Sequence, residues 1–103
     1  MEIIETKIFT DKICKLLSDE EYLRLQNHLV KNPNSGDIIK GSGGLRKLRW
    51  KLQKTGKSGG LRNIYYHYEN RNQIYMIYVY QKSKQTDLTP TQISLLRKEF
   101  LGD

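Results

Sequence analysis

Apolar residues recur at two different periods along this chain of 103 residues. A short run rich in Ile predicts a first strand at residues 2–9. Apolar residues then follow at helical spacing behind Thr10 and Ser18, which predicts two helices with these residues as N-caps. Ser18 and Glu21 have the spacing of a capping box, and Pro33 ends the second helix because proline disfavours helical backbone in the residue before it.

Three later segments are predicted to be strands. Leu45–Leu52 alternates apolar and basic residues, as a strand with one solvated face does. Leu61–Glu69 and Gln73–Gln81 are rich in Tyr, Ile and Val, and residues 70–72 form a hairpin turn between them. Because consecutive strands joined by short turns pair antiparallel, these segments predict a small, mainly antiparallel sheet.

A last, short helix is predicted near the C-terminal end. Thr89 is its N-cap, Pro90 occupies the first helical position, and Gln92 completes a capping box. Its inner stripe comprises Ile93, Leu96 and Phe100. The order of elements is therefore β-α-α-β-β-β-α. We expect a single domain over residues 1–103 with an α+β fold, in which the two N-terminal helices pack on one face of the sheet.

Cys14 is the single cysteine, so an internal disulfide is excluded. It falls on the apolar side of the first predicted helix, and we expect a buried structural thiol. The sequence has no run of about 18 apolar residues that would span a membrane, and its N-terminus lacks the basic-then-apolar order of a signal peptide. We therefore expect a soluble, cytoplasmic protein.

The net charge of +7 is concentrated in one segment. Eight of the 18 basic residues lie between Ile38 and Tyr68, where there is no Asp or Glu. The other ten basic residues are offset by all eleven acidic ones, which leaves −1 for the rest of the chain. Concentrated positive charge gains free energy by releasing counterions from a polyphosphate, which points to nucleic acid. On charge alone, a solvated and solubilising face is the alternative.

Residue sets typical of metal or nucleotide sites are missing. His28 and His67 have no second His or Cys at ligand spacing, so each is interpreted as a structural residue. Gly56–Ser58 matches the end of a Walker A motif, but Lys51 replaces the required glycine and a strand follows instead of a helix. We expect no metal and no other cofactor.

Basic side chains gather on the predicted strands instead. In an extended strand Lys47, Arg49 and Lys51 share one face, while Arg46 points to the other. Three more basic residues lie at the ends of the later strands: Arg62, Lys82 and Lys84. If the late strands are neighbours, these groups converge over one end of the sheet. There they would hold RNA phosphates and stabilise the charge that develops when a 2′-hydroxyl attacks phosphorus.

Six tyrosines in the last two strands add aromatic faces: Tyr65, Tyr66, Tyr68, Tyr75, Tyr78 and Tyr80. Most must be structural, because a two-faced sheet needs bulky residues on its helix side. One or two would stack on unpaired bases, and we assign this role to Tyr65 and Tyr80.

Two glycine-basic motifs resemble the HigB branch of RelE-type toxins: Gly41-Ser-Gly-Gly-Leu-Arg-Lys-Leu-Arg-Trp50 and Gly56-Lys-Ser-Gly-Gly-Leu-Arg-Asn-Ile-Tyr-Tyr66. The segment Tyr78–Leu88, followed by a short helix, is also similar, and the similarity covers nearly the whole chain. The resemblance implies a sheet like that of microbial ribonucleases. It further implies a type II toxin that enters the ribosomal A site and cleaves mRNA there without a metal. A HigA-like helix-turn-helix antitoxin would neutralise the toxin. Operator DNA would be contacted only through this antitoxin.

The resemblance also assigns roles to residues. Arg62 matches the arginine that stabilises the phosphorane, Lys47 and Arg49 resemble a lysine pair that includes the base, and Lys84 falls near the scissile phosphate. Because a guanidinium keeps its proton, Arg49 cannot be the general base, and Lys47 or Lys54 would take that role. Further RNA contacts are expected from Arg46, Lys51, Lys57, Lys82, Tyr65 and Tyr80.

Two other functions fit the same residues. A non-catalytic nucleic-acid-binding module would use the basic segment and the tyrosines equally well. A toxin of the same fold could act on another target, such as a topoisomerase, because a fold alone does not decide chemistry.

Overall fold

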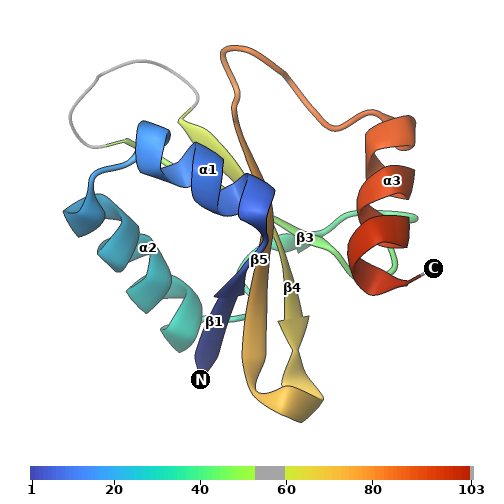
Figure 1. The fold of residues 1–103 in the computed structure, drawn as a ribbon, viewed down its shortest axis with the longest axis horizontal. Helices are drawn as coiled ribbons and strands as arrows, with labels where there is room; N and C mark the ends of the chain where they lie inside the picture. Colours follow the sequence, from blue (N-terminus) through green and yellow to red (C-terminus); the bar gives the residue numbers. More distant parts are fainter. Residues whose placement is uncertain (53–59, 103) are drawn as a thin grey trace.

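A mixed sheet lies at the centre of the fold, with helices against both of its faces (Figure 1). The structure is a computed structural model that describes residues 1–52 and 60–102. Within these residues the sheet consists of β1 (Glu2–Glu5), β2 (Asp37–Ile38), β3 (Arg46–Trp50), β4 (Leu61–Tyr68) and β5 (Gln73–Gln81). The strand order is β1-β5-β4-β3-β2, with β1 parallel to β5 and the other neighbours antiparallel. The short strand β2 was not predicted.

Two helices cover one face of the sheet, and a third lies against the other (Figure 1). Buried apolar residues of α1 (Lys7–Leu16) and α2 (Asp19–Lys31) pack against β3, β4 and β5 on what we call the α1/α2 face. Partly buried residues of α3 (Pro90–Leu101) pack against Ile64 and Ile77 on the α3 face. The predicted α+β architecture, with both N-terminal helices on one face, is confirmed.

The boundary between the first strand and the first helix was predicted wrongly. β1 ends at Glu5, and Thr6 caps α1, because its Oγ1 accepts a hydrogen bond from the Phe9 N–H at 3.1 Å. Phe9 is completely buried as a helical residue. Thr10, the predicted N-cap, lies inside α1 and donates to Glu5 Oε1 at 2.6 Å. A short apolar run fits a strand or a buried helical turn equally well, which is why the boundary was misplaced.

Cys14 is exposed, which corrects the prediction of a buried thiol. α1 turns Phe9 and Ile13 into the core, and successive helical residues are rotated by about 100° from each other. Cys14 follows Ile13 directly and is therefore turned away from the sheet.

The predicted N-cap residues of the other two helices are present, but only α3 has a complete capping box, since at α2 only the Ser18 side chain accepts a hydrogen bond. Ser18 Oγ accepts from the Glu21 N–H at 3.2 Å at the start of α2. At the start of α3, Thr89 Oγ1 accepts from the Gln92 N–H at 3.1 Å, and Gln92 Oε1 accepts from the Thr89 N–H at 3.0 Å. The capping box of α3 is thus confirmed. Its inner stripe differs in one position: Ile93 and Leu96 pack inward together with Leu101, whereas Phe100 is 36% exposed.

A register shift in β5 decides which tyrosines share a face. Ile64 pairs with Tyr78 but Tyr65 pairs with Met76, so Ile77 is an extra residue in β5. An extra residue reverses the alternation of side chains beyond it. As a result Tyr75, Tyr78 and Tyr80 all pack on the α3 face.

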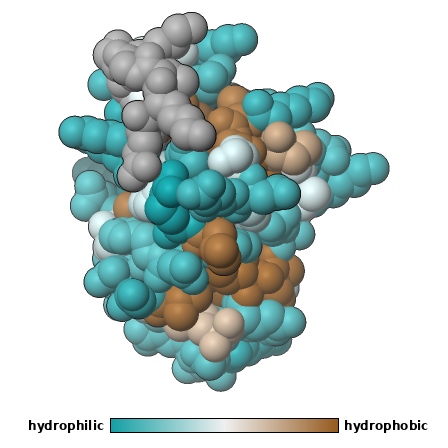
Figure 2. Space-filling view, turned by 90° about the vertical axis from the view of Figure 1, so that its left-hand side faces the viewer, coloured by the Kyte–Doolittle hydropathy of each residue, from teal (hydrophilic) through white to brown (hydrophobic). Residues whose placement is uncertain are grey.

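The side of the molecule on which α2 lies is mainly hydrophilic, with apolar areas in its middle and upper parts (Figure 2). α2 itself leaves Leu23 and Val30 exposed. These two residues are about two helical turns apart and share its outer side, opposite the residues that pack on the sheet. No helix in the described part of the chain is long and apolar enough to cross a membrane.

Candidate nucleic-acid interface

A row of polar side chains crosses three strands on the α3 face. Arg49 of β3 lies directly opposite Arg62 of β4, and Arg62 lies opposite Tyr80 of β5. Lys47 is two residues from Arg49 on the same face, as strand parity predicted. We call Lys47, Arg49, Arg62 and Tyr80 the basic row. Two guanidinium groups on the same face of neighbouring strands can bind one anion together.

Gly60 allows β4 to start close enough to β3 for this pairing. Its φ is +54°, and a Cβ at this position would lie 2.3 Å from the Trp50 carbonyl oxygen. Any other side chain would therefore push the start of β4 away from the end of β3. Arg62 follows two residues later and is only 5% exposed, with its Nη1 donating to the Leu61 carbonyl at 3.3 Å. Low exposure limits the orientations of the guanidinium and strengthens its electrostatic interactions.

Asp87, which the sequence analysis did not single out, places a carboxylate beside the basic row. Lys47 Nζ lies 3.1 Å from Asp87 Oδ1, which also accepts from the Leu88 N–H at 2.9 Å. These hydrogen bonds, together with the charges of Lys47 and Arg62, lower the pKa of the Asp87 carboxyl. The carboxylate is therefore ionised at neutral pH. Asp87 lies in the segment between β5 and α3, outside the basic segment of residues 38–68, so the distribution of charge along the sequence did not indicate its role.

Tyr80 contributes a neutral phenol at the β5 end of the row. The side chain is 6% exposed. Burial, together with the Asp87 charge, raises the pKa of Tyr80 and outweighs the opposing effect of Arg62. Its hydroxyl has no hydrogen-bond partner among the described residues. Tyr80 thus offers a phenolic donor next to Arg62.

Two residues predicted to bind RNA contact the loop after α2. Tyr65 is completely buried, and its hydroxyl donates to the Pro33 carbonyl and accepts from the Gly36 N–H, both at 2.9 Å. Arg46 lies on the α1/α2 face and donates to the Asn34 carbonyl at 3.1 Å and to the Gly36 carbonyl at 2.8 Å. Both side chains hold the loop after α2 against the sheet. A completely buried ring cannot stack on a base, so we withdraw this role from Tyr65, whereas the RNA contact of Arg46 stays a prediction.

The exposed lysines predicted at the strand ends lie near the same end of the sheet as Arg62. The Lys82 N–H donates to the Gly60 carbonyl at 3.2 Å, which places the turn after β5 beside the start of β4. Lys84 follows in the same turn, and Lys51 lies just past the end of β3. Lys54 and Lys57 lie outside the described residues.

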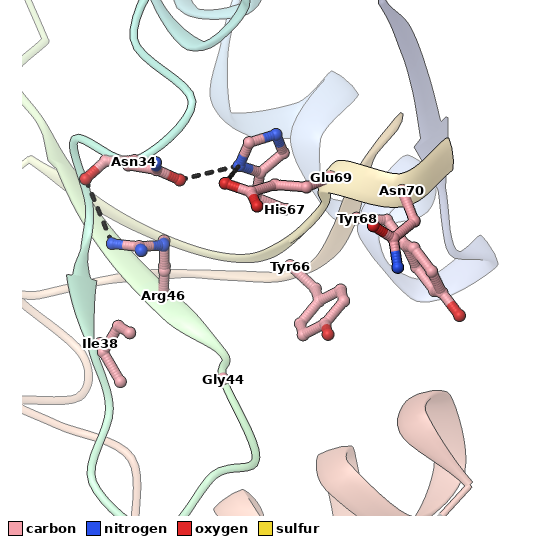
Figure 3. Close-up of a pocket in the computed structure, with 9 residues that line it drawn as sticks. All are labelled: Asn34, Ile38, Gly44, Arg46, Tyr66, His67, Tyr68, Glu69 and Asn70. Atoms are coloured by element: carbon pink, nitrogen blue, oxygen red, sulfur yellow. Dashed lines mark hydrogen bonds and ion pairs between the residues drawn. The ribbon is translucent and has the colours of Figure 1, made fainter. Parts of the chain in front are cut away.

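A polar pocket at the other end of β4 contains one of the two histidines (Figure 3). His67 Nδ1 lies 2.7 Å from Asn34 Oδ1 and 4.0 Å from a Glu69 carboxylate oxygen. In Figure 3 its ring and the Tyr66 ring extend to opposite sides of β4, as neighbouring residues of a strand do. His28 Nε2 lies 3.2 Å from Ser35 Oγ in a separate contact. Among the described residues, no three His, Cys, Asp or Glu side chains are grouped to hold a metal ion.

These features define a class of protein: a small α+β domain with a net charge of +7 and a basic row on one sheet face. Residues 1–100 match the family described as RelE toxin of RelE / RelB toxin-antitoxin system. The chain therefore belongs to the RelE toxin family, whose toxins form type II systems with a cognate antitoxin. A solved structure of a mutant of the E. coli toxin RelE in the free state has a TM-score of 0.58 and 16% sequence identity. The match covers 82% of this chain and 86% of that one, and shows a RelE-like fold.

Proposed function

We propose that this protein is a ribosome-dependent endoribonuclease of the HigB-like branch that cleaves mRNA in the A site. The observation that carries the proposal is the Arg49–Arg62 pair, in which two arginines face each other across neighbouring strands. A phosphate lying over this pair would accept charge-assisted hydrogen bonds from both guanidinium groups. A toxin acting on the ribosome would work in the cytoplasm.

The proposed reaction is attack of a 2′-hydroxyl on the adjacent phosphorus. The P–O5′ bond breaks, which leaves a 2′,3′-cyclic phosphate and a 5′-hydroxyl. Negative charge accumulates on the non-bridging oxygens, and Arg62 and Arg49 would stabilise it from fixed positions without a metal. Because Arg62 is only 5% exposed, the RNA must displace part of its surroundings to reach the guanidinium.

The contact between Lys47 and Asp87 bears on the choice of general base. The hydrogen bond from Lys47 Nζ to Asp87 Oδ1, 3.1 Å long, directs this side chain toward a carboxylate. Of the two lysines proposed for this role, the pairing therefore favours Lys54, with Lys47 binding the phosphate. Lys84, near the same end of the sheet, would add positive charge near the scissile phosphate.

Replacing Arg62 by alanine tests the proposal. In a translating extract, we expect the Arg62→Ala protein to cleave mRNA at least about 100-fold more slowly than the wild type, because a fixed electrostatic donor is lost. Arg24→Ala is the matched control, since Arg24 lies on α2 in a solvent-exposed pair with Glu20. Circular dichroism would verify that both variants are folded.

Arg49→Ala provides a second test, because Arg49 is exposed and its loss leaves the core intact. Undiminished cleavage by both arginine variants would refute the assignment. Intact transcripts together with salt-dependent RNA binding by the wild type would indicate a non-catalytic module. DNA damage without translational arrest in expressing cells would indicate a topoisomerase target.

We propose a HigA-like helix-turn-helix protein as the cognate antitoxin and as the sole route by which the complex contacts operator DNA. An open reading frame for such a protein beside this gene, and its copurification with the toxin, are the expected observations. Copurification with an antitoxin of another class would contradict the HigB-like placement while leaving family membership unchanged.

A further inference from the structure

The edge of β5 that faces β1 is only half covered by that strand. The last pair in the register joins Glu5 to Met76, so β5 continues through residues 77–81 beyond the end of β1. α1 follows along this edge: Thr6 Oγ1 donates to the Ile77 carbonyl at 2.8 Å. A hollow remains between α1 and the second half of β5. We call it the α1–β5 hollow.

The chemistry of the hollow is basic and aromatic. Its lining includes Lys12 and Lys15 of α1, Lys84 of the turn after β5, and Tyr78 and Tyr80, and no Asp or Glu among the residues that the structure describes. Lys12 is half-buried, and its Nζ lies 5.4 Å from the centroid of the Tyr78 ring. This cation–π contact stabilises the lysine in one position, with its aliphatic stem packed and its ammonium at the hollow.

The hollow adjoins the basic row. Tyr80 belongs to both, because it lies opposite Arg62 and also lines the hollow. The ring centroids of Tyr78 and Tyr80 are 6.1 Å apart, so the two rings connect the hollow with the basic row. Lys12 and Lys15 lie far in the sequence from the basic segment, in the part of the chain whose net charge is −1. The fold therefore extends the cationic surface with residues that charge counting excluded.

We propose that the α1–β5 hollow binds the RNA strand adjacent to the scissile phosphate, with Lys12, Lys15 and Lys84 contacting its phosphates. The identity of the ligand as RNA rests on the proposed function. Lysines in a hollow whose described lining includes no acidic residue attract a polyanion, and the Tyr78 ring adds a surface on which a base can stack. The same lysines oppose the addition of a protein strand to this open edge, because charged side chains deter edge-to-edge pairing.

The test compares RNA binding by two variants of the full chain that lose the same charge. Lys12→Gln/Lys15→Gln removes two cations from the hollow and keeps most of each aliphatic stem. Lys31→Gln/Lys98→Gln removes two exposed cations from α2 and α3, away from the hollow. The probe is a short, fluorescent 2′-O-methyl RNA, which has no 2′-hydroxyl to react. Anisotropy titrations at several salt concentrations give the slope of log K against log[salt].

We expect the slope of the Lys12→Gln/Lys15→Gln variant, which we call the hollow variant, to be smaller in magnitude than that of the wild type by about 1.4. Each lost phosphate contact on a single strand accounts for about 0.7. The control variant should keep the wild-type slope. Equal slopes for the two variants overturn the proposal, as does a wild type whose affinity for RNA is independent of salt. Self-association of the hollow variant with an unchanged slope would instead show that the lysines only guard the edge.

Because the probe cannot be cleaved, this result is independent of catalysis. A wild type that binds as expected but cuts no mRNA in a translating extract would refute the proposed function and leave the binding site standing. A wild type that cleaves mRNA, together with equal salt slopes for the two variants, would refute the binding site and leave the proposed function standing.

Discussion

The carboxylate of Asp87 reduces the positive charge of the basic row, because it pairs with Lys47. Its Oδ1 lies 3.1 Å from Lys47 Nζ. The same hydrogen bond contributes most to lowering the pKa of Asp87, so the carboxylate remains ionised well below neutral pH. If the basic row binds RNA as proposed, an RNA phosphate would compete with Asp87 for Lys47. The carboxylate would then weaken RNA binding by the free protein.

Asp87→Asn should tighten the binding of the 2′-O-methyl RNA. The amide oxygen can still accept from the Leu88 N–H, but Lys47 becomes available to a phosphate. We expect the slope of log K against log[salt] to steepen by about 0.7, which corresponds to one additional phosphate contact. Glu99→Gln, which removes an exposed acid from α3, should leave the slope unchanged. Weaker binding by the Asp87→Asn protein would mean that the carboxylate orients Lys47 for RNA.

At this scale, the sequence predicts some site residues and misses others for identifiable reasons. Alternation in β3 correctly placed Lys47 and Arg49 on one face, because side chains of a strand alternate regularly. The common face of Tyr75 and Tyr80 depends on the extra residue Ile77, for which the sequence shows no turn or glycine signal. Asp87 was missed because its contact with Lys47 spans 40 residues.

Among the elements, β1, α1 and α2 are joined through one side chain, Glu5. Its carboxylate accepts from the Thr10 hydroxyl of α1 at 2.6 Å and also from the Tyr22 hydroxyl of α2. The ring of Tyr22 packs near that of Phe9, with centroids 6.0 Å apart. Burial and the hydrogen bond to Glu5 raise the pKa of the Tyr22 phenol well above its ordinary value.

This contact predicts loss of stability in alkali. The folded pKa of Tyr22 lies above the unfolded value of about 10, so its contribution is complete below that pH and is lost as the pH rises further. Tyr22→Phe should lower the free energy of unfolding at pH 8 by about 1.5 kcal/mol, as expected for a hydrogen bond to a charged group. Urea denaturation at pH 8 and at about pH 10.5 measures both effects.

The Tyr22→Phe protein should lose less stability between the two pH values than the wild type. Tyr75→Phe serves as the control, since it removes a hydroxyl from β5 on the other face of the sheet. Identical pH dependence in the wild type and the Tyr22→Phe protein would contradict the role given to this phenol.

Elements with strong local signals were predicted well. Proline and the capping box of α3 act within a few residues, so its start was correct. The start of α1 has no such exclusive signal, since Thr6 and Thr10 are both competent caps. β2 has only two residues, both exposed, and forms through pairing with β3 and not through its own pattern.

In the whole molecule, the two faces of the sheet are used differently. The α1/α2 face holds the larger core cluster, whereas α3 has no fully buried residue and shares its face with the basic row. The layering followed from the order of helical and extended segments. The parallel pairing of β1 with β5 could not be predicted from that order, because nothing in a short N-terminal strand specifies a partner about 70 residues later.

The position of β5 between β1 and β4 has a consequence for the order in which the chain is made. β5 is the last of the described strands to be synthesised, yet its neighbours β1 and β4 both need it to complete the sheet. We expect a chain that stops at Asn72 to show no cooperative unfolding transition by circular dichroism, and a sharp transition would contradict this. A nascent toxin therefore has no Tyr80 beside Arg62 until β5 has been synthesised. If the protein acts on ribosomes as proposed, this delay protects the ribosome that is translating its own message.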